Sequence, residues 1–315
     1  MSAQWHERRE TSSRFTIWLL LTAGLRLGRG FMRAALYPLA LLFFLRRARE
    51  RRDSRAFLDR VLAHPARNRD VLRHIRSYAQ TMLDRVFLLN DANLARFDVH
   101  VRGLDQLEAE VARGRGVLLL GAHLGSFEVL RALTLRKPDL QLRVVMDLQR
   151  TQVLNELMHA LNPGIAANVI DAGGDPGALA LALHEAASQG ALIGLLADRA
   201  RAGEATAAAD FLGAPAYFPT APYLIASMLD LPVVLAFGIY RGASRYDLHF
   251  EIFAQSIKIA RSDRPAQLQK CVAHYAVRLE HYVRLYPYNW SNFYDFWHCP
   301  AERPAARRES AASAR

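Results

Sequence analysis

The chain contains few cysteines and lacks the common nucleotide-binding motifs. Cys271 and Cys299 are the only cysteines in 315 residues, and neither belongs to a Cys-x-x-Cys pair or to a histidine cluster. This excludes a disulfide framework and gives no support to a structural zinc site. There is also no GxxxxGK[ST] loop and no GxGxxG turn, so nucleotide hydrolysis and dinucleotide redox chemistry lack their usual signatures. We therefore predict no metal and no tightly bound cofactor.

Positive charge is concentrated at the two ends of the chain. The formal net charge is +11, of which residues 1–60 contribute +8 (13 Arg against 5 acids) and residues 301–315 contribute +2 (4 Arg against 2 Glu). A nucleic-acid-binding face more often combines basic residues with interleaved aromatics. Here the basic N-terminal end is interleaved with aliphatic runs. This favours anionic lipid headgroups and argues against nucleic acid as a partner.

No apolar run near the N-terminus reaches the roughly 20 residues that span a bilayer as a helix. The two longest runs, 15–25 and 31–45, are joined through Arg26, Arg29 and Arg33. These arginines fall on one helical face, beside a broad apolar surface. The pattern predicts a helix that lies in the membrane interface or forms a hairpin, with a tilted spanning helix and a soluble packed helix as open alternatives.

The end of this segment indicates its orientation. Pro38 is expected to bend or end the helix, and five arginines follow between residues 46 and 52. Arginines of this kind are typical of a cytoplasmic face. We expect attachment to a bacterial inner membrane, with the rest of the chain on the cytoplasmic side.

Beyond residue 52, short apolar runs alternate with segments of helical spacing. Strands are expected at 97–101, 117–121, 142–146, 167–170, 191–197, 232–240 and 246–253. Helices are expected at 54–62, 70–89, 104–113, 126–134, 151–161, 176–188, 222–229 and 265–285. The order predicts an α/β fold with a mixed, roughly seven-stranded sheet flanked by helices, because a short link suited to a hairpin joins the last two strands. We divide the chain into a membrane-associating segment (1–52), one α/β domain (53–300) and a disordered tail (301–315).

The segment VLLLGAHLGSFE (117–128) places a histidine and a carboxylate five positions apart, directly behind a buried strand. Gly125 and Ser126 can open a helix there, with Ser126 as its N-cap, so that Glu128 falls in the first turn. The two side chains can then meet across that turn. A histidine held in this way takes a proton from a hydroxyl, while the carboxylate fixes its tautomer. His123 and Glu128 are therefore candidate catalytic residues.

The spacing by itself is not distinctive. With 11 His and 30 acids in 315 residues, about one His-x4-acid pair is expected by chance, and the chain has a second one, His100 with Asp105. That pair has no glycine turn between its members. The strand, turn and helix around His123 are equally consistent with a catalytic pair and with a structural pair.

Three later segments contain candidate binding residues. Asp198 and Arg199 follow the strand 191–197 at its terminus, where open α/β sheets bind ligands, although such a pair is more often a structural ion pair. A polar loop is expected at 200–210, and FLGAPAYFPTAPY follows it with a proline-rich turn. The hairpin FGIYRGASRYDLHFE presents arginines suited to a phosphate or carboxylate, or to a solvated turn. The aromatic-rich YPYNWSNFYDFW is most simply explained by packing.

Taken together, GAHLGSFE, the triplet at 197–199 and FLGAPAYFPTAP resemble, in order and spacing, the bacterial late acyltransferases of lipid A biosynthesis. These are the lauroyl and myristoyl transferases of the lysophospholipid acyltransferase superfamily, which share a His-x4-Asp/Glu motif. VLRHIRSYAQTMLDRVFLL and YPYNWSNFYDFW resemble more closely the acyltransferases of aryl polyene and xanthomonadin-type pigment clusters. The resemblance covers roughly residues 15–297.

The resemblance implies an O-acyltransferase that moves an acyl chain from a thioester, on acyl carrier protein or coenzyme A, to a hydroxyl of a membrane lipid or glycolipid. It implies that His123 is the general base and Glu128 its partner. The expected substrate-binding residues are Gly125, Ser126, Arg150, Asp198, Arg199, Phe218, Pro219, Thr220, Arg241 and Tyr246. A non-catalytic, membrane-bound scaffold or carrier-protein-binding module is the alternative.

The chain departs from the lipid A enzymes at three places. Arg199 stands where they carry glutamine, and Ala221 replaces the glycine of their Pro-Thr-Gly-Pro turn. The helix at 151–161 has no arginine where those enzymes tend to carry one, and Arg150 is the nearest. These differences favour an acceptor other than lipid A itself.

Overall fold

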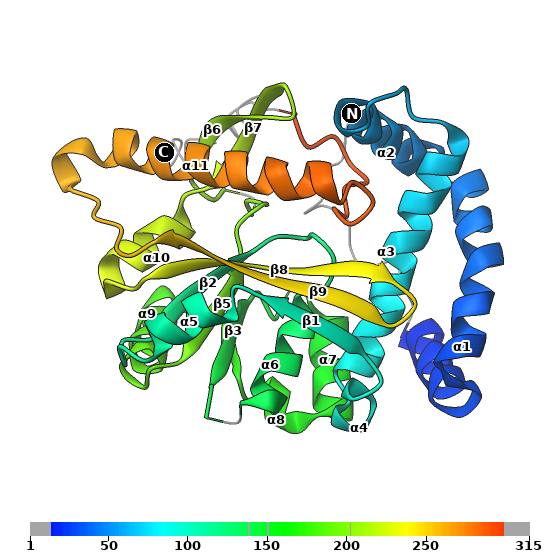
Figure 1. Cartoon of the computed structure of the whole chain (residues 1–315), viewed down its shortest axis with the longest axis horizontal. Helices are drawn as coiled ribbons and strands as arrows, with labels where there is room; N and C mark the ends of the chain where they lie inside the picture. The colour runs from blue at the N-terminus through cyan, green and yellow to red at the C-terminus, as the bar shows by residue number, and fades with distance from the viewer. Residues whose placement is uncertain (1–13, 138, 150, 202, 299–315) are drawn as a thin grey trace, which may run out of the picture.

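The computed structural model describes residues 14–298, except 138, 150 and 202 (Figure 1). The predicted disordered tail at 301–315 lies outside the described residues.

Seven strands form one mixed sheet in the order β1-β9-β8-β2-β5-β3-β4, as the alternating pattern predicts. The five strands from β8 to β4 run parallel, β9 forms an antiparallel hairpin with β8, and β1 runs parallel to β9. The strands are β1 (Asp98–Arg102), β2 (Val117–Gly121), β3 (Leu142–Met146), β4 (Val169–Asp171), β5 (Leu192–Leu196), β8 (Val233–Gly242) and β9 (Arg245–Ala254).

Strand β2 is buried on both faces of the sheet. Val117 and Leu119 belong to one apolar cluster, whereas Leu118 and Leu120 belong to the other. Because side chains alternate across a strand, a run that is apolar throughout requires a cover on each side. The continuous apolar pattern of β2 therefore places it at the centre of a three-layer fold.

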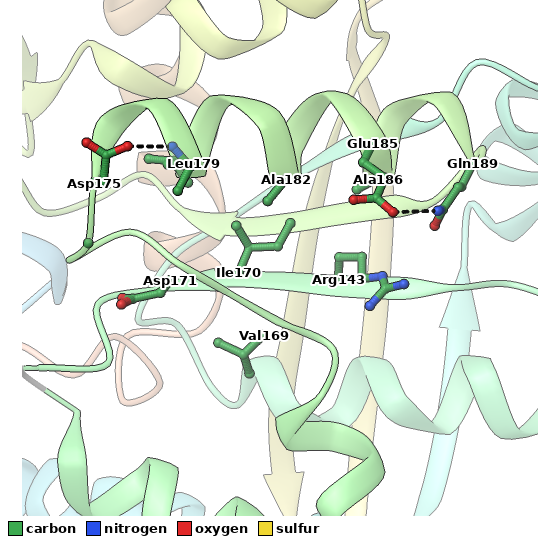
Figure 2. A pocket seen from close by; sticks show the side chains of 12 residues that line it. Arg143, Val169, Ile170, Asp171, Asp175, Leu179, Ala182, Glu185, Ala186 and Gln189 are labelled. Atoms are coloured by element: carbon green, nitrogen blue, oxygen red, sulfur yellow. Dashed lines mark hydrogen bonds between the residues drawn. The ribbon is translucent and has the colours of Figure 1, made fainter.

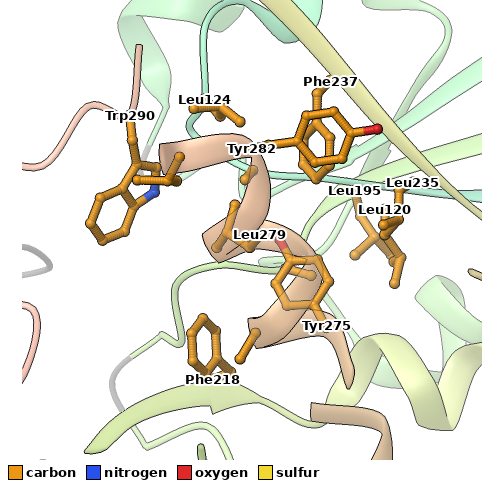
Figure 3. Packing of buried hydrophobic residues seen from close by; sticks show 14 of the residues in the cluster. Leu120, Leu124, Leu195, Phe218, Leu235, Phe237, Tyr275, Leu279, Tyr282 and Trp290 are labelled. Carbon is orange, nitrogen blue, oxygen red and sulfur yellow. The ribbon is translucent and has the colours of Figure 1, made fainter. Parts of the chain in front are cut away.

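Helices supply both covers. The face that contains Leu118 packs against α9, α10 and α11, and the opposite face packs against α5 and α6. Figure 3 shows leucines of β2, β5 and β8 beside Tyr275 of α11. The helices are α1 (Arg14–Arg46), α2 (Ala48–Val61), α3 (Asn68–Leu88), α4 (Asp91–Leu94), α5 (Leu104–Val111), α6 (Arg131–Arg136), α7 (Gln152–Leu161), α8 (Pro163–Ala166), α9 (Pro176–Ser188), α10 (Ala221–Leu229) and α11 (Arg264–Leu285), with 3₁₀ turns η2 (Phe127–Leu130) and η3 (Arg261–Asp263).

Helix α3 lies across the edge at which β8 ends, and α1 packs on α3 (Figure 1). Asp84 of α3 accepts a hydrogen bond from the Tyr246 hydroxyl at 2.9 Å, and Gln80 accepts one from Tyr240 at 2.8 Å. The predicted boundary at residue 52 falls within α2, whose buried side chains join the same core as those of α3.

A second, two-stranded sheet was not predicted. Strands β6 (Thr206–Phe211) and β7 (Ala214–Pro219) form an antiparallel hairpin, so the polar loop expected at 200–210 is wrong from residue 206 onward. Leu212 (φ 52°) and Gly213 (φ 78°) make its two-residue turn, and positive φ at both positions suits the twist of such a hairpin. The alanines of TAAADF conceal the alternation that would have indicated a strand.

Helix α1 differs from the expectation for Pro38. The helix continues through Pro38 to Arg46, and its non-helical backbone lies at Gly28 (φ 80°, ψ 158°). Pro38 therefore does not end the helix. By length and composition alone, Gly28–Arg46 could cross a membrane.

Two arginines of α1, Arg29 and Arg33, contact the protein, whereas the basic N-terminal segment was expected to meet lipid headgroups. Arg29 forms two 2.7 Å hydrogen bonds with Asp84, and Arg33 donates to the Tyr240 hydroxyl at 2.7 Å. Both also donate to the carbonyl of Ala243 in the β8–β9 turn. Apolar side chains on the helix are exposed instead: Phe31, Tyr37, Leu39, Leu41, Leu42 and Leu45.

Candidate active site

Close backbone contacts fix the turn after β2 that carries His123. Gly125 has φ of 75°, and a Cβ there would lie 1.9 Å from the carbonyl oxygen of Gly238 in β8. Only glycine satisfies both conditions. Ser126 N donates to the same oxygen at 2.8 Å, and Gly125 N donates to Asn289 O at 2.9 Å. The turn is therefore held between β8 and the segment around Asn289.

Strand register brings His123 against Asp198. Strands β2 and β5 pair with Gly121 opposite Leu196, and each of the two side chains lies two residues beyond its strand end. His123 Nδ1 is 2.9 Å from Asp198 Oδ1, and His123 N donates to the same oxygen at 3.1 Å. Because a carboxylate only accepts, the neutral ring carries its proton on Nδ1, and Nε2 is the nitrogen able to accept another.

Asp198 is a fully buried carboxylate whose partners favour its charged form. Trp290 Nε1 donates to Oδ2 at 3.1 Å, and Arg199 Nε lies 3.5 Å from the same oxygen. Burial alone would raise the pKa of Asp198, but His123, Arg199 and Trp290 hold this pKa well below its ordinary value. Asp198 is therefore ionised at neutral pH.

The surroundings of His123 favour the neutral form of its imidazole. Burial is the main cause that lowers its pKa below the ordinary value of 6.5, and Arg199 lowers it further. Asp198 opposes both effects, while Arg85 adds to them. The side chain remains 32% exposed, so a substrate can approach the ring. A neutral, accessible imidazole with a fixed tautomer is what general-base chemistry requires.

Glu128 was expected to pair with His123, but the structure pairs it with Ser126 and Arg85. Its carboxylate accepts a hydrogen bond from Ser126 Oγ at 2.8 Å and forms an ion pair with Arg85 Nε at 2.6 Å. No hydrogen bond or ion pair joins it to His123, and both residues are described. The pairing predicted from His-x4-Glu spacing is therefore replaced by a pairing across strands. Ser126 occupies the predicted N-cap position, but its hydroxyl is directed at Glu128 rather than at a backbone amide.

Arg199 is bound within the protein and supports the segment that carries His123. It donates to the carbonyl of Ser291, and its guanidinium lies over the ring of Tyr294 at 5.2 Å. Ser291 N in turn donates to His123 O at 2.8 Å. The ion pair with Asp198, which the sequence left open, is thus part of the scaffold around His123.

The end of β7 and Thr220, which follows it, support the core, and the three predicted residues there are buried. Phe218 is fully buried with its ring 6.0 Å from that of Tyr275, and Pro219 is also buried. Thr220 is 4% exposed, and its hydroxyl donates to Ala205 O at 3.2 Å. The structure therefore gives these three residues a packing role, and their contact with substrate stays a prediction.

The structure places the two hairpin candidates in different environments. Arg241 is 39% exposed, forms a 3.3 Å ion pair with Asp247 and lies over the ring of Tyr286. Tyr246 is fully buried in the other core cluster, bonded to Asp84. Tyr246 thus anchors the packing of α3 and is not placed to meet a ligand. Arg150, the remaining candidate, lies outside the described residues.

Two residues of the site were missed by sequence reasoning. Trp290 binds Asp198, and Tyr275 of α11 donates to the carbonyl oxygen of Gly121 at 2.8 Å. The aromatic-rich segment at 286–297 drew attention to this region, but nothing in it indicated that Trp290 in particular would bind Asp198. For Asp198, the usable signal was that two strands of a parallel sheet end at the same edge.

An apolar cavity of about 260 Å³ lies next to η2, the 3₁₀ turn that follows the His123 segment. Phe127 and Glu128 of η2 form part of its wall, and the remaining lining comes from β3, α6, α7 and neighbouring loops. Most of these side chains are aliphatic: Leu89, Leu140, Leu142, Val144, Met146, Leu154, Met158, Ile165 and Val169.

A second, larger cavity of about 380 Å³ lies between α9 and strands β3 and β4 (Figure 2). Arg143, Asp171 and Glu185 give it a mixed polar lining, and no residue of the His123 turn belongs to it. Among the described residues, no group of three or more His, Cys, Asp or Glu side chains could hold a metal ion.

Comparison with known proteins agrees with the geometry. Residues 4–298 match the family described as bacterial lipid A biosynthesis acyltransferase, and the chain belongs to that family. The family supports acyltransferase activity and association with membranes. No curated protein matches the chain. The likeness to pigment-cluster acyltransferases stays a prediction.

Proposed function

We propose that the protein transfers an acyl chain from an acyl thioester to a hydroxyl of a lipid or glycolipid acceptor at the inner membrane. The observation that carries this proposal is the His123–Asp198 pair. It sets a neutral, tautomer-fixed and partly exposed imidazole in the segment that continues into Phe127 and Glu128, two residues of the wall of the aliphatic cavity. Acyl transfer needs both a base for the acceptor hydroxyl and an apolar site for the chain.

The reaction requires no covalent enzyme intermediate. His123 Nε2 removes the proton from the acceptor hydroxyl as its oxygen attacks the thioester carbonyl. The tetrahedral intermediate then expels the thiolate, which takes the proton back from the imidazolium. Asp198 holds the ring and stabilises its charged form during this cycle.

Three backbone N–H groups of the turn after β2 already donate hydrogen bonds within the protein. Those of His123, Gly125 and Ser126 donate to Asp198, Asn289 and Gly238 respectively. We therefore do not assign the developing oxyanion to these amides. Glu128, which forms an ion pair with Arg85, lines the aliphatic cavity that we expect to hold the acyl chain.

Charge and surface character indicate the partners. Residues 46–76 contain 11 Arg and 4 acids, so α2 and α3 present a basic surface suited to an acidic donor such as acyl carrier protein. Coenzyme A is the alternative donor. Arg241, half-exposed near the end of β8, suits an anionic group on the acceptor. We expect no tightly bound cofactor and no nucleic-acid partner.

The orientation of α1 favours attachment in the membrane interface. Arg29 and Arg33 are bonded to the domain, and a helix that crossed the bilayer along its length would carry these contacts into the hydrocarbon. The exposed apolar residues from Phe31 to Leu45 suit the headgroup boundary, and the arginines that follow suit the cytoplasmic leaflet.

The test is acyl transfer from purified acyl-carrier-protein thioesters to lipid extracts, combined with mass spectrometry of lipids from a deletion strain. His123→Ala should lower the rate by about 10² to 10⁴ because the base is lost. His100→Ala is the matched control, because His100 belongs to the other His-x4-acid pair and is half-exposed on β1. A folded His123→Ala enzyme with an undiminished rate would exclude the proposed role. Wild-type protein that binds acyl carrier protein without turnover would support a scaffold instead.

A further inference from the structure

The indole of Trp290 is hydrogen-bonded to Asp198, the partner of His123. Its side chain is fully buried, with ring centroids of Phe57, Phe211 and Phe296 between 4.8 and 5.2 Å away. Its N–H donates to Oδ2 of Asp198, the carboxylate oxygen that His123 does not use. The ring therefore fixes the rotation of the carboxylate against the imidazole.

His74 holds the backbone of Trp290. This α3 residue is fully buried, with Nε2 2.8 Å from Trp290 O and Nδ1 2.7 Å from Ser54 Oγ of α2. A carbonyl oxygen only accepts, so Nε2 carries the hydrogen and Nδ1 accepts from the Ser54 hydroxyl. Burial lowers the pKa of His74 to about 4, so the ring stays neutral and serves as a fixed donor.

The segment 289–291 also holds the backbone on which His123 sits. Gly125 N donates to Asn289 O at 2.9 Å, and Ser291 N donates to His123 O at 2.8 Å. One short segment thus binds the catalytic turn through its backbone and Asp198 through a side chain. Its central carbonyl, that of Trp290, is held from the opposite side by α3.

We propose that His74 and Trp290 are positioning residues for the base. Trp290 sets the orientation of Asp198, and His74, itself oriented by Ser54, holds Trp290 in place. This inference rests on the proposed function, since it concerns the same His123. It extends that function by making Ser54 and His74, at the junction of α2 and α3, part of what sets the pKa of His123.

Trp290→Phe tests the first link. Removing the indole N–H leaves Asp198 a stronger proton acceptor, so the pKa of His123 should rise by about half a unit to one unit. The acid limb of kcat/KM should move to higher pH by the same amount. kcat should fall about tenfold, the equivalent of one lost hydrogen bond, with KM within about twofold.

His74→Phe tests the second link. The phenyl ring keeps the stacking on Phe293 (centroid distance 4.4 Å) but cannot donate to Trp290 O. The shift of the acid limb should have the same direction and a smaller size. His74→Gln, which can donate through its amide, should restore wild-type behaviour. Ile75→Val is the matched control, because it loosens the next buried position of α3 without touching these hydrogen bonds.

The decisive measurement is the titration of His123 itself, by nitrogen NMR of the ¹⁵N-histidine-labelled full chain in detergent, with His123→Gln to assign its signal. Among the described residues, the charged groups that act on the pKa of His123 include Asp198, Arg199 and Arg85, and these three remain in both variants. A raised His123 pKa in both variants, restored by His74→Gln, supports the inference.

An unchanged His123 titration in folded Trp290→Phe and His74→Phe protein overturns the inference. If His74→Phe does not fold, Ser54→Ala takes its place, and an unchanged titration in Ser54→Ala and Trp290→Phe has the same meaning. Failure of the proposed function is recognised separately, because His123→Ala would then retain acyl transfer whatever the titrations show.

Discussion

Asp198 and Asp84 are both fully buried carboxylates, and each lies at the centre of a polar network near one edge of the sheet. Asp198 bonds to a histidine that is about one-third exposed. Asp84 bonds to Arg29 of α1 through two 2.7 Å hydrogen bonds and to the hydroxyl of buried Tyr246. The two sites use the same anion for different purposes.

The difference lies in the partner's ability to give up a proton. Arg29 binds Asp84 through two parallel hydrogen bonds, and this bidentate ion pair joins α1 to the domain. Burial and Asp84 raise the pKa of Tyr246 well above its ordinary value, so that group also stays fixed. An imidazole can both accept and release a proton, so the Asp198 site can transfer protons.

The largest expected effect is that of Asp198→Asn. The amide keeps the size of the side chain but can present a donor to Nδ1, which favours the wrong tautomer of His123. kcat should fall by about 10³ to 10⁴ while the protein stays folded. Steady-state kinetics and circular dichroism check both parts. A loss of less than tenfold would mean that Asp198 does not orient the base.

Asp84→Asn should affect stability rather than chemistry. It leaves Arg29, whose side chain is 16% exposed, without its carboxylate. The free energy of unfolding should fall by about 3 kcal/mol, as for a buried pair that loses one member. Urea denaturation in detergent measures this loss. The acid limb of kcat/KM for the folded protein should not move. A shift there would mean that Asp84 also acts on the base and is not purely structural.

Arg85→Gln should produce the smallest effect. Because protonated His123 cannot act as a base, activity falls with decreasing pH through the pKa of His123, which lies below 6.5. Removing the Arg85 charge raises this pKa, so the acid limb should move to higher pH by a few tenths of a unit. Arg113→Gln, at an arginine bonded to Glu110 and Gln255, is the control and should leave the pH profile unchanged. A shift to lower pH would contradict the assigned electrostatics.

Much of the sheet could be predicted from local patterns. All seven strands, including the hairpin that makes the sheet mixed, follow from apolar runs bounded by turn residues, and the structure confirms them. The β6–β7 hairpin was not predictable in this way, because alanine-rich TAAADF shows no alternation and its contacts lie with α11.

The site was predicted in location but not in pairing. His123 and Asp198 were each expected at a strand end, yet the partner of His123 was sought along the chain at Glu128. Spacing reports neighbours along one helix turn, whereas the contact that forms depends on the register of β2 against β5. The sequence alone does not contain that register in readable form.

The arginines of α1 show the same limit. Their spacing correctly puts Arg29 and Arg33 on one helical face, but it carries no information on what that face meets. The structure directs them at Asp84, Tyr240 and the β8–β9 turn. A charged stripe beside an apolar surface is consistent with either lipid or protein, and buried acceptors decide between them.

The contact between Gly125 and Gly238 limits how this protein could be re-engineered. A Cβ at Gly125 would lie 1.9 Å from the oxygen of Gly238, and a Cβ at Gly238 would lie 2.2 Å from the oxygen of Ser126. Neither position can be randomised alone or jointly without moving the backbone beneath the base. A library aimed at new chain-length or acceptor preferences should leave both codons untouched and diversify the cavity wall at Leu154 and Met158 instead.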